Sequence, residues 1–112
     1  MERALKPEEL ALLRSMLESA AREDLIEKLD DANVVEMKDG GMGSLRFITN
    51  ATKMDSVLCE AEGVDADGVP LEISINVDEH GSLFELDIWK VDFTPLQSYP
   101  QPLSLRFLNP KS

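Results

Sequence analysis

Two pairs of carboxylates are the residues of this chain whose types and spacing could do chemistry. Glu85 and Asp87 stand two positions apart, and so do Glu60 and Glu62. In an extended strand such neighbours share one face, so either pair could act as general acid and general base. The same spacing is typical of the solvated side of a sheet, and we adopt that interpretation. We assign no catalytic residue and retain a small hydrolase or ligand-binding enzyme with a carboxylate pair as an alternative.

Histidine and cysteine, which are common in active sites, occur once each in this chain. His80 lies in a polar stretch that predicts a turn with a solvated imidazole, and one histidine cannot form a histidine metal cluster. Cys59 alternates with apolar neighbours, which predicts a small buried side chain rather than a nucleophile. A single cysteine also excludes an internal disulfide. We expect no metal and no cofactor.

The stretch "DADGVPLE", residues 65–72, places hard oxygen ligands around a glycine, as calcium-binding loops do. A loop of the EF-hand type needs a third ligand two positions after the second, and a glutamate at its end. Val69 and Asn76 stand at those two positions, so the pattern fails. We interpret the stretch as a turn between two strands.

The stretch "DGGMGS", residues 39–44, holds three glycines and raises the question of phosphate binding. A phosphate-binding glycine loop follows a strand and opens a helix, whose N-terminus holds the anion. Here "LRFIT" follows, with the alternation of a strand, and the Gly-Lys-Ser/Thr ending is missing. The pattern favours a hairpin turn with unusual backbone angles.

Two helices are predicted ahead of these motifs. Pro7 followed by two glutamates is typical of a helix start, because proline suits the first position and carboxylates suit the positive end of the dipole. Apolar residues then recur at helical spacing, with Glu9 predicted to face elsewhere; they are Leu10, Leu13, Leu17 and Ala20, with Met16 beside them. Leu25, Ile26 and Leu29 form a second apolar set. We favour two helices with a break near residues 19–23 over one long helix.

After Asn33 the apolar period changes to two, which predicts strands separated by glycine turns. The architecture is therefore α+β: two N-terminal helices (1–32) packed on an antiparallel meander sheet of about five strands (33–94). A proline-rich tail (95–112) is expected to wrap and end in an edge strand, all within a single domain. The apolar phase slips between Ile88 and Trp89, which indicates either a bulge or a strand buried on both faces.

Three blocks of the sequence together resemble a small bacterial family of unknown function: "DGGMGSLRF", "ADGVPLEISINVD" and "LFELDIWKVDFTPL". The resemblance covers roughly residues 33–96 and implies no activity, ligand or catalytic residue. Small acidic bacterial proteins of α+β type are often immunity proteins or other partner-binding modules. This analogy at the level of the fold favours binding over catalysis.

Charge narrows the choice of partner, since 22 acidic and 11 basic residues give a net charge of −11. A polyanion repels nucleic-acid phosphates and anionic lipid, so we expect neither as a partner. No apolar run is long enough to span a membrane, and the N-terminus lacks the apolar core of a signal peptide, so we expect a cytoplasmic protein. A basic protein is the partner that the charge favours.

Six carboxylates fall on polar positions of three successive predicted strands: Glu60, Glu62, Glu72, Asp78, Glu85 and Asp87. If these strands are neighbours, the six share one sheet face with almost no basic residues to offset them. Like charges that face each other across strands destabilise a sheet, so we predict that the acidic face binds a basic partner. A face that only keeps the protein soluble is the competing interpretation.

Trp89, the only tryptophan, is expected to pack in the core between sheet and helices. The alternative is an exposed anchor for a partner. The function predicted from the sequence is a non-enzymatic protein-binding module of immunity-protein type. A dimerisation or subunit domain is a further alternative, so the oligomeric state stays open.

Overall fold

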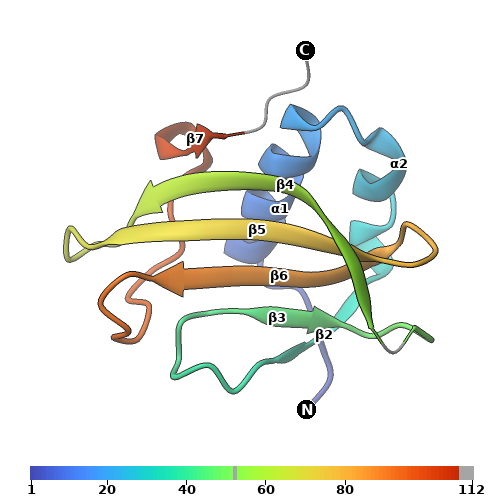
Figure 1. The fold of residues 1–112 in the computed structure, drawn as a ribbon, viewed down its shortest axis with the longest axis horizontal. Coiled ribbons are helices and arrows are strands. Elements are labelled where there is room, and N and C mark those ends of the chain that lie inside the picture. The colour runs from blue at the N-terminus through green and yellow to red at the C-terminus, as the bar shows by residue number, and fades with distance from the viewer. Residues whose placement is uncertain (52, 109–112) are drawn as a thin grey trace.

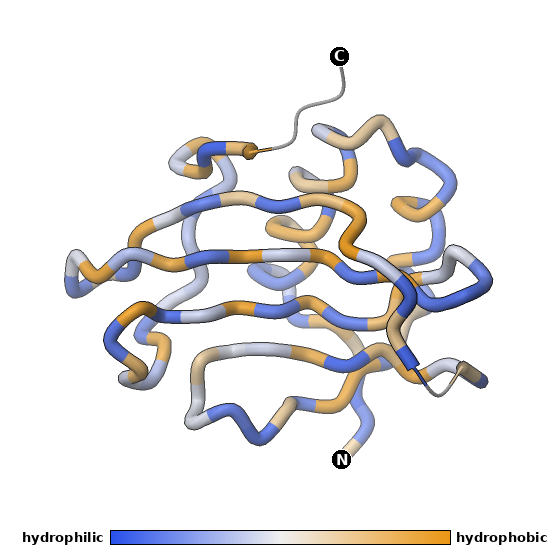
Figure 2. Tube along the Cα trace, in the orientation of Figure 1, coloured by the Kyte–Doolittle hydropathy of each residue, from blue (hydrophilic) through white to orange (hydrophobic). Residues whose placement is uncertain are grey.

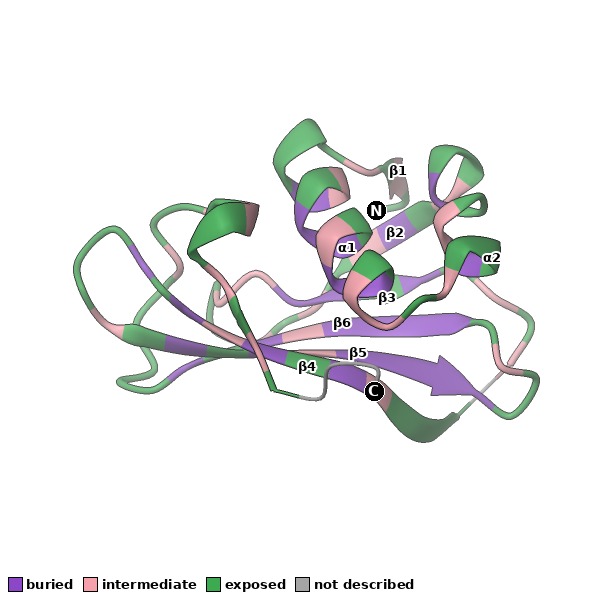
Figure 3. Cartoon of the chain, turned by 90° about the horizontal axis from the view of Figure 1, so that it is seen from above, coloured by how far each residue is buried: buried purple, intermediate pink, exposed green. Residues whose placement is uncertain are grey.

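A computed structural model of the chain describes residues 1–51 and 53–108. The fold is α+β, as predicted: helices pack on one face of an antiparallel sheet of seven strands in the order β1-β2-β3-β6-β5-β4-β7 (Figures 1 and 3). The helices are α1 (Pro7–Ser19), α2 (Glu23–Ile26) and two short 3-10 turns (Leu29–Asp31 and Pro102–Ser104). The strands are β1 (Arg3–Ala4), β2 (Asn33–Glu36), β3 (Leu45–Phe47), β4 (Met54–Val64), β5 (Pro70–Asp78), β6 (Leu83–Lys90) and β7 (Arg106–Phe107).

Helix α1 begins at the predicted proline, but one of its glutamates is not solvated as expected. Glu9 is only 2% exposed, because its carboxylate accepts hydrogen bonds from the backbone N–H of Lys6 at 2.8 Å and from both terminal nitrogens of Arg3. The predicted break is confirmed, since Ala21 has a positive φ of 57° after α1 ends. The second helix is a single turn.

The meander is correct for three strands and wrong for the sheet as a whole. Strands β4, β5 and β6 follow one another, but β3 pairs with β6 rather than with β4. Strands β6 and β5 therefore lie between β3 and β4 in the sheet, although β4 follows β3 in the sequence. This order sets Leu45 opposite Leu86, so the β2–β3 hairpin extends the apolar face of the sheet on which the helices pack.

Two short strands lie outside the predicted range of the sheet. β1 precedes α1 and pairs with β2, and β7 in the proline-rich tail pairs with β4 as the predicted edge strand. Each has two residues, so β7 pairs with only Ala61 and Glu62 of the eleven-residue β4. The last four residues of the predicted tail, 109–112, lie outside the described residues.

The core lies between α1 and the inner face of the sheet. Figure 2 shows hydrophobic and hydrophilic residues alternating along the central strands. Cys59 is buried there, as predicted. Leu10 is only partly buried, while its neighbour Leu12 is fully buried. The largest fully buried apolar side chains are Leu12, Leu13, Met16, Leu17, Leu29, Leu45, Leu71, Ile73, Ile75 and Leu86.

No bulge occurs where the apolar phase slips. Ile88, Trp89 and Lys90 pair in unbroken register with β5, so Lys90 takes the inner position that follows Ile88 and Trp89 faces outward. The strand is not buried on both faces here either, since Trp89 is 44% exposed. Both alternatives followed hydropathy alone, whereas a lysine keeps this inner position through buried ion pairs. A shift in the register lies at the other end of β6, next to Asn76.

Candidate functional site

The helices leave one face of the sheet uncovered in the part of the chain that the structure describes, and we call it the open face (Figure 3). Strand register places five of the six predicted carboxylates on it. Glu62 lies directly opposite Glu72, while Glu60 and Asp87 flank Ser74 from either side. Glu85 lies opposite Asn76, two positions before Asp87 on the same face. The face is therefore formed as predicted, and its binding of a partner stays a prediction.

The sixth carboxylate, Asp78, does not lie on the open face. It is 1% exposed and caps the β5–β6 turn by accepting hydrogen bonds from the backbone N–H groups of His80 at 2.8 Å and Ser82 at 3.1 Å. Burial alone raises the pKa of Asp78, but these hydrogen bonds outweigh it and lower the pKa below its ordinary value. Asp78 belongs to the turn and not to a binding surface. His80 is exposed, as predicted.

Basic residues offset more of the open face than predicted. Arg46 of β3 binds Glu85 at 2.7 Å and also lies over the ring of Phe84, with its guanidinium carbon 4.9 Å from the ring centroid. Arg106 of β7 binds Glu62 at 3.1 Å on the other side of the face. Both arginines come from outside residues 54–93, where Lys90 is the only basic residue, so the acidic run in the sequence concealed them.

The two carboxylates of the pair differ in burial, since Glu85 is buried and Asp87 is half-buried. The side-chain amide nitrogen of Asn76 donates to both carboxylates at 3.4 Å, and Glu85 is buried. Burial, together with the charge of Glu85, raises the pKa of Asp87. The amide oxygen of Asn76 is buried and has no hydrogen-bond partner among the described residues. Ionised Asp87 therefore lies where further hydrogen-bond donors would stabilise it.

Trp89 is an exposed residue and not a core residue, which corrects our expectation. It is 44% exposed, and its ring lies 5.9 Å from that of Phe93 at an interplanar angle of 48°. Phe93 is itself 67% exposed and has a positive φ of 65°, which is rare for an aromatic residue. The two rings form an exposed aromatic pair at the end of β6, in agreement with the alternative of an exposed anchor.

A groove of about 300 Å³ runs across the open face beside this aromatic pair. We call it the Trp89 groove. Carboxylates from three strands line it together with the tryptophan and residues of the loop before β3; the lining includes Asp39, Met42, Glu60, Glu72, Asp87 and Trp89. An aromatic wall beside several carboxylates is suited to a cationic group.

The glycine loop turns the chain, as predicted, and also holds the tail. Gly41 accepts a hydrogen bond from the backbone N–H of Leu96 at 2.8 Å, and Gly43 accepts one from the Tyr99 hydroxyl at 2.6 Å. Asp39 accepts the backbone N–H groups of Met42 and Ser44 at 3.0 Å each. A side-chain carboxylate thus occupies N–H groups that a phosphate would need.

A larger cavity of about 590 Å³ lies between this loop, the start of α1 and the tail. Its charged groups bind one another, since Arg3 contacts Glu9 at 2.8 Å and Glu36 at 3.0 Å. Burial raises the pKa of Tyr99, whose hydroxyl already donates to Gly43. These contacts join β1 to α1 and β2, and the tail to the glycine loop. We therefore assign the cavity a structural role.

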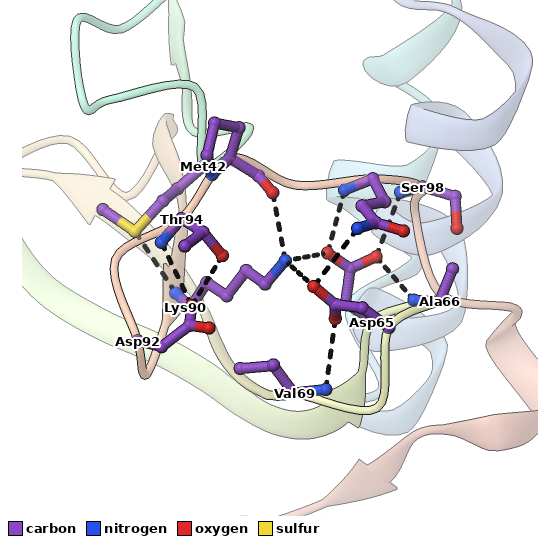
Figure 4. A network of polar contacts seen from close by, with 11 residues as sticks. Met42, Asp65, Ala66, Val69, Lys90, Asp92, Thr94 and Ser98 are labelled. Atoms are coloured by element: carbon purple, nitrogen blue, oxygen red, sulfur yellow. Dashed lines mark hydrogen bonds and ion pairs between the residues drawn. The ribbon is translucent and has the colours of Figure 1, made fainter.

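A buried ion cluster around Lys90 is the feature that the sequence analysis missed (Figure 4). The Lys90 side chain is 0% exposed, and its ammonium lies 2.8 Å from Asp65, 2.6 Å from Asp67 and 3.0 Å from the carbonyl oxygen of Pro95. Asp65 also accepts the backbone N–H groups of Gln97 and Ser98. Asp65 and Asp67, the aspartates of the stretch that resembles a calcium loop, therefore bind an internal cation, the Lys90 ammonium.

The cluster keeps both partners ionised. Burial opposes ionisation of Asp65, but hydrogen bonds from Lys90 and from backbone N–H groups outweigh burial and lower its pKa to about 2. Burial likewise opposes the charge of Lys90, and the hydrogen bonds to Asp65 and Asp67 nevertheless raise its pKa. Among the described residues, no group of three or more His, Cys, Asp or Glu side chains could hold a metal ion.

Comparison with known protein families agrees with the resemblance seen in the sequence. Residues 2–100 match the model of a family described as Domain of unknown function (DUF6984). The chain belongs to this family. The match extends from the resembling blocks back through α1, so α1, α2 and strands β1 to β6 lie within the matched residues, while β7 lies beyond them.

Searches of the curated proteins and of the solved structures returned no match. In the described residues, no helix is long and apolar enough to cross a membrane. The family description carries no activity, so any function has to be argued from the site itself.

Proposed function

We propose that this chain is a non-enzymatic protein-binding module whose open face binds a basic partner protein. The observation that supports this function is the gathering of five carboxylates and an exposed tryptophan on the sheet face that the helices of the described residues leave uncovered. Surfaces that bind proteins commonly combine an aromatic anchor with a charged rim.

Cross-strand repulsion opposes part of this arrangement. Glu62 and Glu72 lie directly opposite each other in the register, where like charges destabilise a sheet, and Arg106 offsets the charge of Glu62 only. A basic partner would remove this repulsion and would be attracted over a distance, which raises the association rate. Repulsion tolerated in the free protein is therefore consistent with attraction of a partner.

Charge reversal on the open face tests the proposal. Glu85 is a poor choice because it is buried and bound to Arg46, so we choose Glu60 and Glu72, which are both exposed. Changing both to lysine leaves the helix side of the sheet untouched. The matched control changes Glu18 and Glu27, exposed on the helical side, to lysine with the same change in net charge.

Affinity capture from the organism that produces the chain would compare the wild type with these two variants. We expect basic proteins that the wild type and the Glu18→Lys/Glu27→Lys control retain, and that the Glu60→Lys/Glu72→Lys variant loses. Equal recovery by both variants would show that the open face is a solvated surface and would overturn the proposal.

A carboxylate-pair enzyme is the second candidate, favoured by the raised pKa of Asp87 beside Glu85. Its weakness is that Arg46 and Asn76 already engage Glu85, which leaves that carboxylate poorly placed to act as a base. A hydrolytic activity that Asp87→Asn abolishes, while the Glu18→Lys/Glu27→Lys control retains it, would establish the enzyme instead.

A further inference from the structure

Three features in and beside the Trp89 groove identify the chemistry of what it would bind: a planar aromatic wall, carboxylates on two sides of that wall, and, next to Asp87, a buried amide whose oxygen has no partner among the described residues. We propose that the groove binds an arginine side chain of the partner protein, with the guanidinium stacked on Trp89 and paired with Glu72 and Asp87. This inference rests on the proposed function, because it names the group through which the basic partner is recognised.

The aromatic wall is held in place before any partner arrives. Phe93 supports the indole of Trp89, and its backbone N–H donates to the carbonyl of Lys90 at 2.9 Å. Asp92 accepts hydrogen bonds from the backbone N–H and the hydroxyl of Thr94, which fixes the turn that carries Phe93. A planar cation can stack on an aromatic ring prepared in this way without ordering it first.

The carboxylates stand at positions that a guanidinium on this wall would reach. Glu72 lies directly opposite Trp89 in the register of β5 and β6. Asp87 is two positions before Trp89 on the same face of the same strand, and Glu60 lies across Ser74 from Asp87. A guanidinium has five N–H donors in a planar fork, so it can contact two carboxylates while it stacks.

The environment of Asp87 favours a donor-rich cation. Ionised Asp87 is disfavoured by burial and by Glu85, and its neighbour Asn76, whose amide nitrogen lies 3.4 Å away, offers it only a long hydrogen bond. A bound cation would stabilise the ionised carboxylate. The cation would also supply hydrogen-bond donors to Asp87, which now shares the single amide group of Asn76 with Glu85.

Arginine fits the groove better than the other candidate occupants. A lysine ammonium is compact and strongly hydrated, and it lacks a plane to lie on the indole. A second copy of this chain would bring its own net charge of −11 against the same acidic face. Arginine is also more weakly hydrated than lysine, so it loses less on entering a partly desolvated groove.

Trp89 is the only tryptophan of the chain, so its fluorescence reports on the groove directly. The probes are three capped peptides of identical length that carry three arginines, three lysines or three citrullines on a glycine-serine backbone. We expect a saturable change in Trp89 fluorescence with the arginine peptide, about ten-fold weaker binding of the lysine peptide and no binding of the neutral citrulline peptide.

Single substitutions test whether the arginine peptide binds in the Trp89 groove. Glu72→Gln should weaken the arginine peptide about ten-fold by removing one charged partner, while Glu27→Gln on the helical side should leave it unchanged. Equal binding of arginine and lysine peptides, or no effect of Glu72→Gln, would overturn the inference. A fluorescence change that depends on protein concentration without peptide would assign the groove to a second copy and would overturn it too.

The two proposals fail in different ways. If the peptides fail these criteria while Glu60→Lys/Glu72→Lys still loses the captured partner, the arginine site is wrong and the binding face stands. If the reversal leaves the captured partner unchanged, the proposed function is wrong, whatever the peptides do.

Discussion

At the scale of single residues, Lys90 carries the most unusual environment in the molecule. A lysine with no exposed surface is held by two aspartates that come from the β4–β5 turn, and by a backbone carbonyl of the tail. Its removal would leave Asp65 as an uncompensated buried charge, which is among the most destabilising changes a protein can suffer.

Lys90→Met should therefore lower the melting temperature by more than about 10 °C, as measured by thermal unfolding followed by circular dichroism. The matched control is Lys28→Met, because Lys28 is exposed, and it should shift the midpoint by only about 1–2 °C. Equal midpoints for the two variants would show that the buried cluster contributes nothing.

The same cluster predicts how stability depends on pH. Asp65 has a pKa of about 2 in the folded chain and ~3.9 when unfolded, so its contribution is present above the unfolded value and is lost as pH falls toward 2. Asp65→Asn should be destabilising at pH 7, and its difference from the wild type should shrink between pH ~4 and ~2. Urea unfolding at several pH values measures this, and a difference that is independent of pH would contradict it.

Trp89 and Lys90 also show where hydropathy misleads at this scale. The alternation of Leu86 and Ile88 places residue 90 on the inner face of the sheet. A lysine, however, indicates a solvent-exposed position unless its ion-pair partners are known. Those partners lie about 25 positions earlier in the chain, so no local pattern reveals them. The signal available in the sequence was that Lys90 is the only basic residue among residues 54–93.

At the scale of elements, the glycine loop offers a matched pair of substitutions. A Cβ at Gly43 would lie 2.7 Å from a methyl carbon of Leu96 in the tail, whereas a Cβ at Gly40 meets nothing within 4 Å. Both glycines have a positive φ, so backbone strain alone costs each alanine variant about 1–2 kcal/mol.

Gly43→Ala should be more destabilising than Gly40→Ala, because it also displaces the tail, and it should expose residues 95–108 to limited proteolysis. Chemical unfolding gives the stability difference, and the proteolysis pattern locates it. If both variants are equally stable and equally resistant, the loop does not hold the tail.

Strand β5 predicts the cost of a cavity in the sheet. Ile73 is buried between Ala61 of β4 and Ile88 of β6. Ile73→Ala should lower the free energy of unfolding by about 2–5 kcal/mol, while Val57→Ala at an exposed position of β4 should cost less than about 1 kcal/mol. An unchanged midpoint for Ile73→Ala in urea would show that β5 is wrongly assigned.

Most elements could be predicted from the sequence because their signals are local. The start of α1 at Pro7, the break before α2 and the long alternation of β5 each depend on neighbours within a few residues. The order of strands could not, because the pairing of β3 with β6 joins Leu45 to Leu86, about 40 residues apart. The strand β1 escaped prediction because two residues carry no periodicity, whereas the edge strand β7 was predicted from the alternation in the tail.

At the scale of the whole molecule, the uneven distribution of charge is the feature that links fold and function. The helices take one side of the sheet, and five carboxylates gather on the other. Alternation in the sequence predicted that face, since each strand has one polar side. It missed the arginines that offset part of the charge and wrongly included Asp78, because both depend on strand order and turn geometry.

The most direct test of the binding face is the association rate with a purified partner, measured at increasing salt. The wild type should associate fast at low salt and slow steeply as salt rises, because screening weakens a single-sign surface. Glu60→Lys/Glu72→Lys should be slower by orders of magnitude at low salt and should approach the wild type at high salt, while Glu18→Lys/Glu27→Lys stays close to the wild type throughout. An association rate that the open-face reversal leaves unchanged would contradict the account.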